Sequence, residues 1–550
     1  MTTTDSPNKA SVRTELPVIT LLTIGAFIVR VLYVVRIDRI VWGDEPFYLW
    51  LGRNWLTGHG YTFTGYQDVH HTPLFPLLSG IFYLMTGDLQ VASNIVYVIC
   101  GALFVIPIYL IGFEMYGRRI AVLAAVLDGV WPAITVAVLH WGTMTEPPYL
   151  LFIYSGIYCG LLALRERGRW PALFAGGFLA LAYLTRPEAI GYLVAIVGLI
   201  GIVRLGERRL FTRRTMATLL LVVLGYMIFF FPYAYYVRQT TGEWMISEKA
   251  GVTYVTSKSL AYGDAVTFDK LTWGLDSAGT EVFFFSPESY NVSIIQVIRQ
   301  DPWDFARLFY TNVRRFWNSL LSIRLFPYWL LPLIVLGWMK KPWSRDRLKI
   351  ELYLLAAISP VLGFLVFFVQ DRYILAMVPG LIIWAASGLS VVQEWLDSTL
   401  VTLVPYVKPR LAQLAAVGLP LLLVLGYLAA SVPTVIRAAN TGSWRWEHRT
   451  IGLWLRDNTP PGGIVETRYP AIAFYAEKHW IPSPNAPIAD ALRYSRIKKA
   501  TYWVVDQRET ARLRPQFAPL LEGKATPDLV PVYTDTSSSE KLIVYRLVVP

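Results

Sequence analysis

Apolar runs of about 20 residues alternate with short polar segments over the first 433 residues of the chain. A helix of this length is long enough to cross a bilayer. The pattern therefore predicts a polytopic α-helical membrane domain over residues 1–433, with about eleven transmembrane helices. We expect these helices at residues 17–35, 92–113, 120–139, 148–164, 171–184, 189–203, 215–236, 325–338, 352–369, 374–391 and 411–432.

One further apolar run, residues 74–85, is predicted to lie along the outer surface of the membrane. Counting it as a crossing would place Arg118 and Arg119 outside and invert every later loop, whereas basic residues gather in inner loops. With the amino terminus inside, the outer side receives two long loops, residues 36–91 and 237–324. Polar chemistry is therefore expected in these outer loops.

The segment from residue 434 to residue 550 has a different pattern. Short strand-like runs alternate with helical stretches, and Pro and Gly punctuate them, which is typical of a small soluble α/β domain. This domain follows the last predicted span and is expected on the outer side. The predicted localisation is a multi-pass protein of the plasma membrane, with a cytoplasmic amino terminus and an extracytoplasmic carboxy-terminal domain.

Composition agrees with a membrane protein. The chain is 55% hydrophobic and only 16% charged, which is too apolar for an average soluble chain. The net charge of +12 comes from basic residues in short loops, where they set topology and contact the headgroups of anionic membrane lipids. No basic stretch is interleaved with aromatic residues, so nucleic acid is not an expected partner. Cys100 and Cys159 lie inside apolar runs and are interpreted as buried hydrophobes.

The sharpest candidate for chemistry is the acidic pair Asp44 and Glu45, directly after the first predicted span. Adjacent carboxylates repel each other, which favours protonation of one of them and suits a proton acceptor. Together they could also hold a divalent metal ion, and the cofactor requirement stays open. The structural alternative is that one carboxylate caps the helix that Pro46 begins.

Three further charged residues lie at predicted outer turns. Glu146 stands where the chain leaves the bilayer and turns back, so it either serves chemistry or interacts with the dipole of the following helix. Arg186 and Arg372 defy the bias against basic residues in outer loops. Two arginines that face two carboxylate sites could clamp a phosphate, although Glu188 and Asp371 are obvious ion-pair partners for them.

His70 and His71 end the polar part of the first outer loop. Adjacent histidines without further ligands at regular spacing are a weak metal signal, so the alternatives are contact with a phosphate or sugar and a loop-packing role. Asp128, inside the third predicted span, either has an intramembrane function or bonds a neighbouring helix. The sequence contains no nucleotide-binding glycine loop, nucleophile elbow or zinc helix.

Taken in order along the chain, these motifs resemble the GT-C membrane glycosyltransferases. The most similar branch is that of the protein O-mannosyltransferases and lipid A aminoarabinose transferases. The resemblance spans residues 17–388 and rests on the Asp-Glu pair, the His-Thr-Pro-Leu segment, the acid Glu146, an Arg-Pro-Glu turn and the Arg-Tyr turn at residues 372–373. One departure is Thr72-Pro73, where this group usually has two prolines.

The resemblance implies an inverting transfer of a hexose or pentose from a polyprenyl-phosphate-linked donor to a hydroxyl acceptor outside the cytoplasm. Asp44 would be the base that takes the acceptor's proton, and Glu45 and Glu146 would line the site. The implied substrate-binding residues are Arg186, Arg372, Tyr373, His70 and His71. The phosphate leaves as a stable anion, so cationic stabilisation is needed and a general acid is not. The acceptor remains a glycan, a protein or a lipid.

Two other classes of protein share part of this pattern. A transporter or lipid flippase also has many spans, but transporters place ionisable groups near the membrane midplane and often show two matching halves. Here the charges lie at outer turns, with Asp128 as the exception. A non-catalytic scaffold would explain the outer domain alone. Replacement of Asp44 distinguishes an enzyme from a scaffold, because a scaffold would not depend on that carboxylate.

Overall fold

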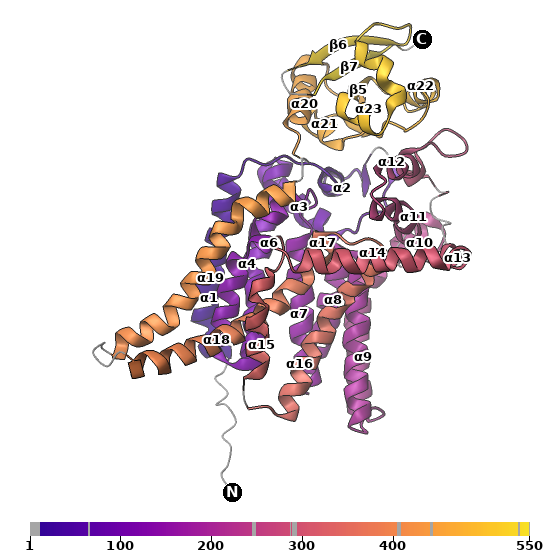
Figure 1. Ribbon diagram of the computed structural model, residues 1–550. Helices are drawn as coiled ribbons and strands as arrows, with labels where there is room; N and C mark the ends of the chain where they lie inside the picture. The colour runs from indigo at the N-terminus through magenta and orange to yellow at the C-terminus, as the bar shows by residue number, and fades with distance from the viewer. Residues whose placement is uncertain are drawn as a thin grey trace.

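A computed structural model of the chain describes residues 12–63, 66–244, 249–286, 288, 294–340, 342–403, 409–440, 444–536 and 540–548. Long helices form a bundle, and a small domain built from the carboxy-terminal residues lies beyond one end of it (Figure 1). Short helices of the two long loops occupy the level between them (Figure 1). The predicted fold class, a polytopic helical membrane protein with a carboxy-terminal α/β domain, is confirmed.

Eight helices in the described part are long and apolar enough to cross a membrane, or nine if one bent pair counts as a span. The eight are built on α1 (Val12–Arg36), α4 (Leu89–Tyr116), α7 (Glu146–Leu164), α9 (Ile190–Gly206), α10 (Arg213–Thr241), α16 (Arg345–Ile358), α18 (Val378–Leu403) and α19 (Pro409–Asn440). The bent pair consists of α5 (Arg118–Val130) and the segment Pro132–His140, which meet at 52°. The remaining predicted spans correspond to two shorter apolar helices. These are α8 (Trp170–Thr185) and the segment Tyr328–Met339, which contains α15 (Leu331–Met339).

Two close helix contacts in the bundle depend on glycine. A Cβ atom added at Gly176 of α8 would lie 1.8 Å from the carbonyl oxygen of Val222 in α10. One added at Gly388 of α18 would lie 1.7 Å from the carbonyl oxygen of Leu333 in α15. Small residues let two helix backbones approach each other, which is a common way of packing helices in membranes. Any larger side chain at these two positions would push the helices apart.

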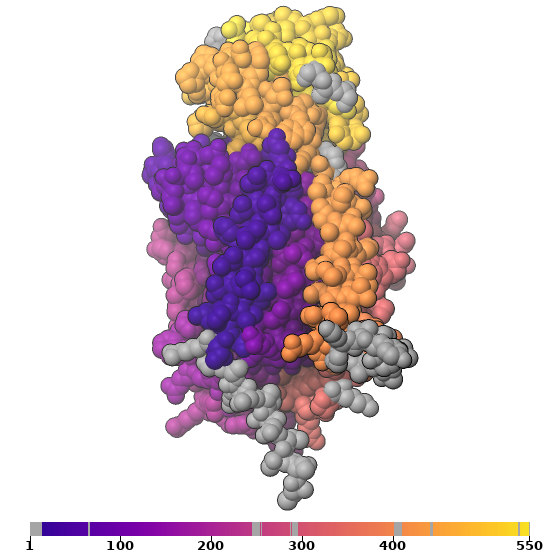
Figure 2. All heavy atoms as spheres, turned by 90° about the vertical axis from the view of Figure 1, so that its left-hand side faces the viewer, coloured from indigo at the N-terminus to yellow at the C-terminus, as the bar shows by residue number. Residues whose placement is uncertain are grey.

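Apolar side chains cover the outside of the bundle. Figure 2 shows α1 in indigo and α19 in orange on one face, below the carboxy-terminal domain. Exposed leucines follow both helices, among them Leu21 and Leu32 on α1 and Leu414 and Leu422 on α19. On a soluble protein so large an apolar surface would be a site of association. On this bundle it is the surface that meets lipid.

The first long loop, residues 36–91, folds into short elements at the end of the bundle. These are α2 (Glu45–Leu56), β1 (Thr62–Phe63), β2 (Tyr66–Gln67) and α3 (Leu74–Thr86). A Cβ atom added at Gly52 of α2 would lie 2.2 Å from the carbonyl oxygen of Pro76 in α3, so these two helices cross in close contact. α3 lies beside α2 on the side of the carboxy-terminal domain (Figure 1). Its placement along the outer surface of the membrane stays a prediction.

The second long loop, residues 237–324, is tied to the carboxy-terminal domain. It contains α11 (Lys249–Ala261), α12 (Ala265–Trp273), α13 (Ile294–Gln300) and α14 (Pro302–Leu320). Asp269 of α12 is fully buried and accepts hydrogen bonds from Arg468 (2.7 Å) and Arg514 (2.8 Å) of that domain. The two guanidinium groups compensate the buried carboxylate. This contact fixes one end of the loop that continues into α14.

The carboxy-terminal domain is built on a five-stranded sheet with the strand order β4-β3-β5-β7-β6. Its parallel part consists of β4 (His479–Ile481), β3 (Ile464–Glu466) and β5 (Tyr502–Asp506), and its antiparallel part adds β7 (Leu542–Leu547) and β6 (Leu529–Asp535). The helices are α20 (Trp446–Asn458), α21 (Pro470–Tyr475), α22 (Ile488–Ile497) and α23 (Gln507–Arg512). The boundary predicted at residue 434 lies inside α19, which continues through Pro433 to Asn440, because membrane helices tolerate proline.

The two ends of the bundle can be assigned to the two sides of the membrane by labelling. The native thiols Cys100 and Cys159 are buried, so an introduced surface cysteine provides the signal. Lys524→Cys in the carboxy-terminal domain should react with a membrane-impermeant maleimide in intact cells. Arg213→Cys, at the opposite end of the bundle where α10 begins, should react only after permeabilisation. Labelling of Arg213→Cys but not Lys524→Cys in intact cells would reverse the predicted orientation.

Candidate functional site

Asp44 lies in a loop that is held against another loop. The Glu45 N–H donates a hydrogen bond to the carbonyl oxygen of Gly142 (2.9 Å). Gly43 has φ of +65°, and a Cβ atom there would lie 2.8 Å from the same oxygen, so glycine is required. Asp44 occupies the N-cap position of α2, but its side chain makes no capping hydrogen bond and is 47% exposed. Helix capping therefore does not account for this carboxylate.

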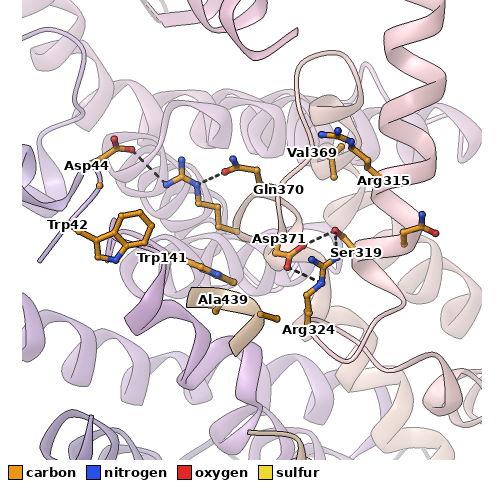
Figure 3. A pocket seen from close by; sticks show the side chains of 14 residues that line it. Trp42, Asp44, Trp141, Arg315, Ser319, Arg324, Val369, Gln370, Asp371 and Ala439 are labelled. Atoms are coloured by element: carbon orange, nitrogen blue, oxygen red, sulfur yellow. Dashed lines mark hydrogen bonds and ion pairs between the residues drawn. The ribbon is translucent and has the colours of Figure 1, made fainter. Parts of the chain in front are cut away.

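A polar cavity of about 590 Å³ lies beside Asp44 (Figure 3). Its walls come from the loop before α2, the turn at Trp141, α14, the segment that leads into α17 (Asp371–Ile374), and the end of α19. Its charged lining residues are Asp44, Arg315, Arg324, Asp371 and Arg372. With three arginines and two aspartates, the cavity suits an anionic ligand that also carries polar groups.

Arg372 reaches toward Asp44 inside this cavity. The distance between its Nη1 and the Asp44 Oδ2 is 3.7 Å. The Arg372 Nε donates to Oε1 of Gln370 (3.0 Å), and its Nη2 donates to the hydroxyl oxygen of Tyr373 (3.0 Å). These bonds hold the planar guanidinium in one orientation, as bidentate recognition of an anion requires. Asp44 and Arg372, two residues that the sequence singles out, thus meet in one cavity.

Asp371 is not the partner of its neighbour Arg372. The Asp371 carboxylate accepts a hydrogen bond from the hydroxyl of Ser319 in α14 (2.7 Å) and lies 3.4 Å from the Nε of Arg324 (Figure 3). The alternative in which Arg372 only pairs with Asp371 at a solvated surface therefore differs from the structure. The two adjacent residues point to different walls of the cavity, and each pairs across it.

Glu146 and Arg186 form a buried ion pair outside the cavity lining. The Arg186 Nη1 donates to Oε1 of Glu146 (3.0 Å), and its Nε donates to Oε1 of Glu188 (2.6 Å). Its guanidinium carbon lies 5.3 Å from the centre of the Tyr373 ring. Neither Arg186, predicted as a phosphate clamp, nor Glu146, predicted as a lining residue, belongs to the cavity lining, and the two charges pair with each other. Arg186 thus packs against Tyr373.

Glu45 also differs from its predicted role. It is fully buried, and its two oxygens accept hydrogen bonds from Arg39 (2.7 and 2.8 Å), while the hydroxyl of Ser93 in α4 donates to Oε1 (2.6 Å). The Glu45 carboxylate is thus engaged by Arg39 and Ser93, whereas Asp44 faces the cavity. Among the residues that the structure describes, no group of three or more His, Cys, Asp or Glu side chains is placed to hold a metal ion.

The two histidines pack the first long loop. His71 Nδ1 lies 2.9 Å from a carboxylate oxygen of Asp68, and His70 stacks on Phe284 with 5.3 Å between the ring centres. Burial opposes ionisation of Asp68, but its interactions with the two imidazoles outweigh that effect and hold the pKa of Asp68 below its usual range. The cavity lining does not include His70 or His71. The structure thus agrees with the loop-packing alternative and differs from the predicted substrate contact.

Sequence reasoning missed the wall of the cavity that α14 provides. Arg315, Asn318 and Ser319 belong to α14, and Arg324 follows it. The signal that could have identified the two arginines is the one used for Arg372: basic residues are disfavoured in outer loops. Their long sequence distance from Asp44 gave no reason to place them beside it.

Asp128 lies in the interior of the bundle and not in the cavity lining. It is fully buried on α5, and within the described part of the chain neither of its carboxylate oxygens has a hydrogen-bond partner. Arg30 of α1 is also buried and donates to the carbonyl oxygen of the adjacent Gly129 (3.3 Å), so a positive charge is close. The predicted hydrogen bond from Asp128 to a neighbouring helix is therefore not formed in the described part of the chain, and an intramembrane function of this residue stays a prediction.

Comparisons with known proteins point to one fold. The family model for dolichyl-phosphate-mannose-protein mannosyltransferases matches residues 70–236. The oligosaccharyltransferase AglB from Archaeoglobus fulgidus, solved with an inhibitory peptide and a dolichol-phosphate, matches with a TM-score of 0.52 and 15% identity, over 98% of this chain and 75% of that one. ArnT from Cupriavidus metallidurans, solved with undecaprenyl phosphate, matches with a TM-score of 0.52 and 13% identity, over 97% of each chain. No curated protein sequence matches.

The buried pair of Arg39 and Glu45 predicts a stability effect. Arg39→Met leaves the Glu45 carboxylate buried without its counter-ion, and we expect a loss of about 3–5 kcal/mol in the free energy of unfolding. The double variant Arg39→Met/Glu45→Leu removes both charges and should recover most of this loss. Thermal unfolding of the protein in lipid nanodiscs compares the variants. A double variant as unstable as the single one would contradict charge compensation as the reason for the pair.

Proposed function

We propose that this chain, which has the fold of the GT-C glycosyltransferases, is an enzyme. It transfers a sugar from a polyprenyl-phosphate-linked donor to a hydroxyl acceptor on the extracytoplasmic face. The solved neighbours hold a dolichol-phosphate or undecaprenyl phosphate, and the matching family model is named for a dolichyl-phosphate donor. These similarities support a lipid-linked phosphate as the donor's leaving group. The resemblance supports transfer with inversion at the anomeric carbon.

The observation that carries this proposal is the state of Asp44 in the cavity. Two carboxylates line the cavity, and Asp371 is engaged by Ser319 and Arg324. Asp44 is half-exposed, and within the described part its side chain has one ionic contact, with Arg372. A general base must be reachable by the substrate and have free lone pairs. Asp44 meets both requirements, so it is the base in the proposed reaction.

In the proposed reaction, the acceptor hydroxyl attacks the anomeric carbon of the donor while Asp44 takes the hydroxyl proton. A bond forms between the acceptor oxygen and that carbon, and the bond between the carbon and the phosphate oxygen breaks on the opposite face. The electron pair of the broken bond stays on the phosphate. One displacement of this kind inverts the configuration, and the phosphate leaves without a general acid.

Proton uptake by Asp44 changes the electrostatic role of Arg372. Before transfer, the guanidinium faces the negative carboxylate at 3.7 Å. When Asp44 becomes neutral, Arg372 loses that counter-charge. At the same time the departing phosphate gains negative charge. Arg372 then interacts more strongly with the phosphate in the transition state than in the ground state, which is the condition for accelerating the chemical step. Gln370 and Tyr373 keep the guanidinium in position.

Replacement of the proposed base tests the function. Asp44→Asn keeps the shape of the side chain but removes the basic oxygen, and we expect transfer to fall by at least about 100-fold. Asp38→Asn is the matched control, because Asp38 lies in the same loop, is exposed and does not line the cavity. Turnover with a panel of polyprenyl-phosphoryl sugars, measured in nanodiscs, compares the two. Transfer by Asp44→Asn at the wild-type rate would exclude Asp44 as the base.

Charge and geometry at Arg372 can be separated with lysine. Arg372→Lys keeps the positive charge but loses the fixed donors that match phosphate oxygens, so we expect a lower kcat with a smaller change in KM. Steady-state kinetics against the lipid-linked donor measure both constants. Arg449→Lys, at a partly exposed position in the carboxy-terminal domain and outside the cavity lining, serves as the control. A lysine variant with wild-type kinetics would contradict a role for the Arg372 guanidinium in the transition state.

A further inference from the structure

α14 presents three different faces. Leu308, Asn312 and Phe316 are spaced by four residues and are buried against the rest of the protein. Arg315, Asn318 and Ser319 line the cavity. A third face carries Trp303, Tyr310 and Trp317, spaced by seven residues and exposed to 84%, 64% and 52%. One helix thus forms a wall of the cavity on one side and exposes large aromatic side chains on another.

The aromatic face shows the depth of α14 in the membrane. Trp and Tyr are enriched where a bilayer meets water, because their rings are apolar and their N–H and O–H groups are polar. Figure 1 shows α14 running across the end of the bundle and not along it, at the level of α17. An amphipathic helix with this orientation lies in the membrane interface. The cavity face of α14 is therefore at the depth of lipid headgroups.

Arg315 is the cavity-lining arginine that has no acidic partner among the described residues. Arg372 faces Asp44 at 3.7 Å, and Arg324 faces Asp371 at 3.4 Å. The contacts that Arg315 makes are weaker than these two ion pairs.

The Arg315 guanidinium lies 5.5 Å from the centre of the Phe368 ring, and its Nη1 donates to the carbonyl oxygen of Leu260 at 3.4 Å. Burial lowers the pKa of Arg315, but an arginine keeps its proton in proteins. A half-buried cation without a counter-ion is unfavourable, so the site favours an incoming anion.

We infer that Arg315 and Asn318 bind the phosphate group of the lipid-linked donor in the ground state, on the wall of the cavity across from Asp44, and that Arg372 interacts with the same phosphate as its bond to the sugar breaks. Figure 3 shows Arg315 and Asp44 on opposite sides. The inference rests on the proposed function, because it places that reaction's donor. It leaves the side of Asp44 to the acceptor hydroxyl and puts the sugar between the two walls. The isoprenoid chain leaves the cavity at the level of α14, where the bilayer begins.

Binding of farnesyl phosphate, a short isoprenyl phosphate, tests this site. The protein is placed in nanodiscs of phosphatidylcholine, which adds no net anionic lipid, and the dissociation constant is measured by calorimetry. Arg315→Gln should weaken binding by about 10-fold or more, since a hydrogen bond to a charged group is lost. The matched control is Arg314→Gln, which removes the same charge from the preceding, exposed position and should leave binding unchanged. Arg315→Lys should give an intermediate affinity, and it replaces Arg315→Gln in this test if the glutamine variant does not fold.

Two further ligands identify the source of the anion. Farnesol, which lacks the phosphate, should bind weakly and equally to all variants. Inorganic phosphate should bind far more weakly than farnesyl phosphate. If it binds as well, Arg315 holds a free anion and the lipid assignment is overturned. Equal losses in Arg314→Gln and Arg315→Gln would reduce the effect to general surface charge and would also overturn the inference.

The outcome is separable from that of the proposed function. Asp44→Asn should still bind farnesyl phosphate through Arg315 while transfer is lost. If Arg315→Gln binds like the wild type although Asp44→Asn is inactive, the phosphate site is wrong and the reaction stands. If binding depends on Arg315 but Asp44→Asn transfers normally, the assignment of the base fails and the phosphate site stands.

Discussion

Charge compensation at the end of the bundle that faces the carboxy-terminal domain governs the arrangement of the loops there. A carboxylate or guanidinium that leaves water is costly unless a counter-charge and hydrogen bonds replace the water. Buried charges at this end therefore pair with groups of opposite charge, some within one loop and some on separate segments. The pairs are Glu45 with Arg39, Glu146 and Glu188 with Arg186, Asp371 with Arg324, and Asp269 with Arg468 and Arg514. These contacts hold the two long loops in place, and one of them ties the second long loop to the carboxy-terminal domain.

The same constraint explains which residues remain available for chemistry. Most charges near the cavity are used in fixed pairs, and they rigidify the site without touching a ligand. Asp44 and Arg372 form the loosest pair, at 3.7 Å with a half-exposed carboxylate, so a proton on Asp44 can break it. Arg315 has no acidic partner in the described part of the chain. The proposed base and the proposed phosphate site are thus the two points where compensation is incomplete.

The sequence predicts much of the fold because hydrophobic length and basic loops are local signals. All eleven predicted spans correspond to helices, and the family resemblance based on short motifs agrees with the GT-C fold. Which charged side chains pair with each other is not a local property of the sequence. Asp371 and Arg372 are adjacent, yet they pair with Arg324 and Asp44, because the packing of α14 and of the loop before α2 decides which groups they meet. For the same reason the sequence could not tell that Glu45 points into the bundle while Asp44 points into the cavity.

The central claim is that the cavity holds a lipid-linked sugar and that Asp44 activates an acceptor hydroxyl, which attacks this sugar. Mass spectrometry of the lipids that copurify with the wild-type protein and with Asp44→Asn tests this claim most directly. Without the base, the donor should bind but not react, so the account predicts that intact polyprenyl-phosphoryl sugar is enriched in the variant relative to the wild type, which should instead retain polyprenyl phosphate. The same bulk phospholipids in both preparations, with no polyprenyl lipid in either, would contradict the account.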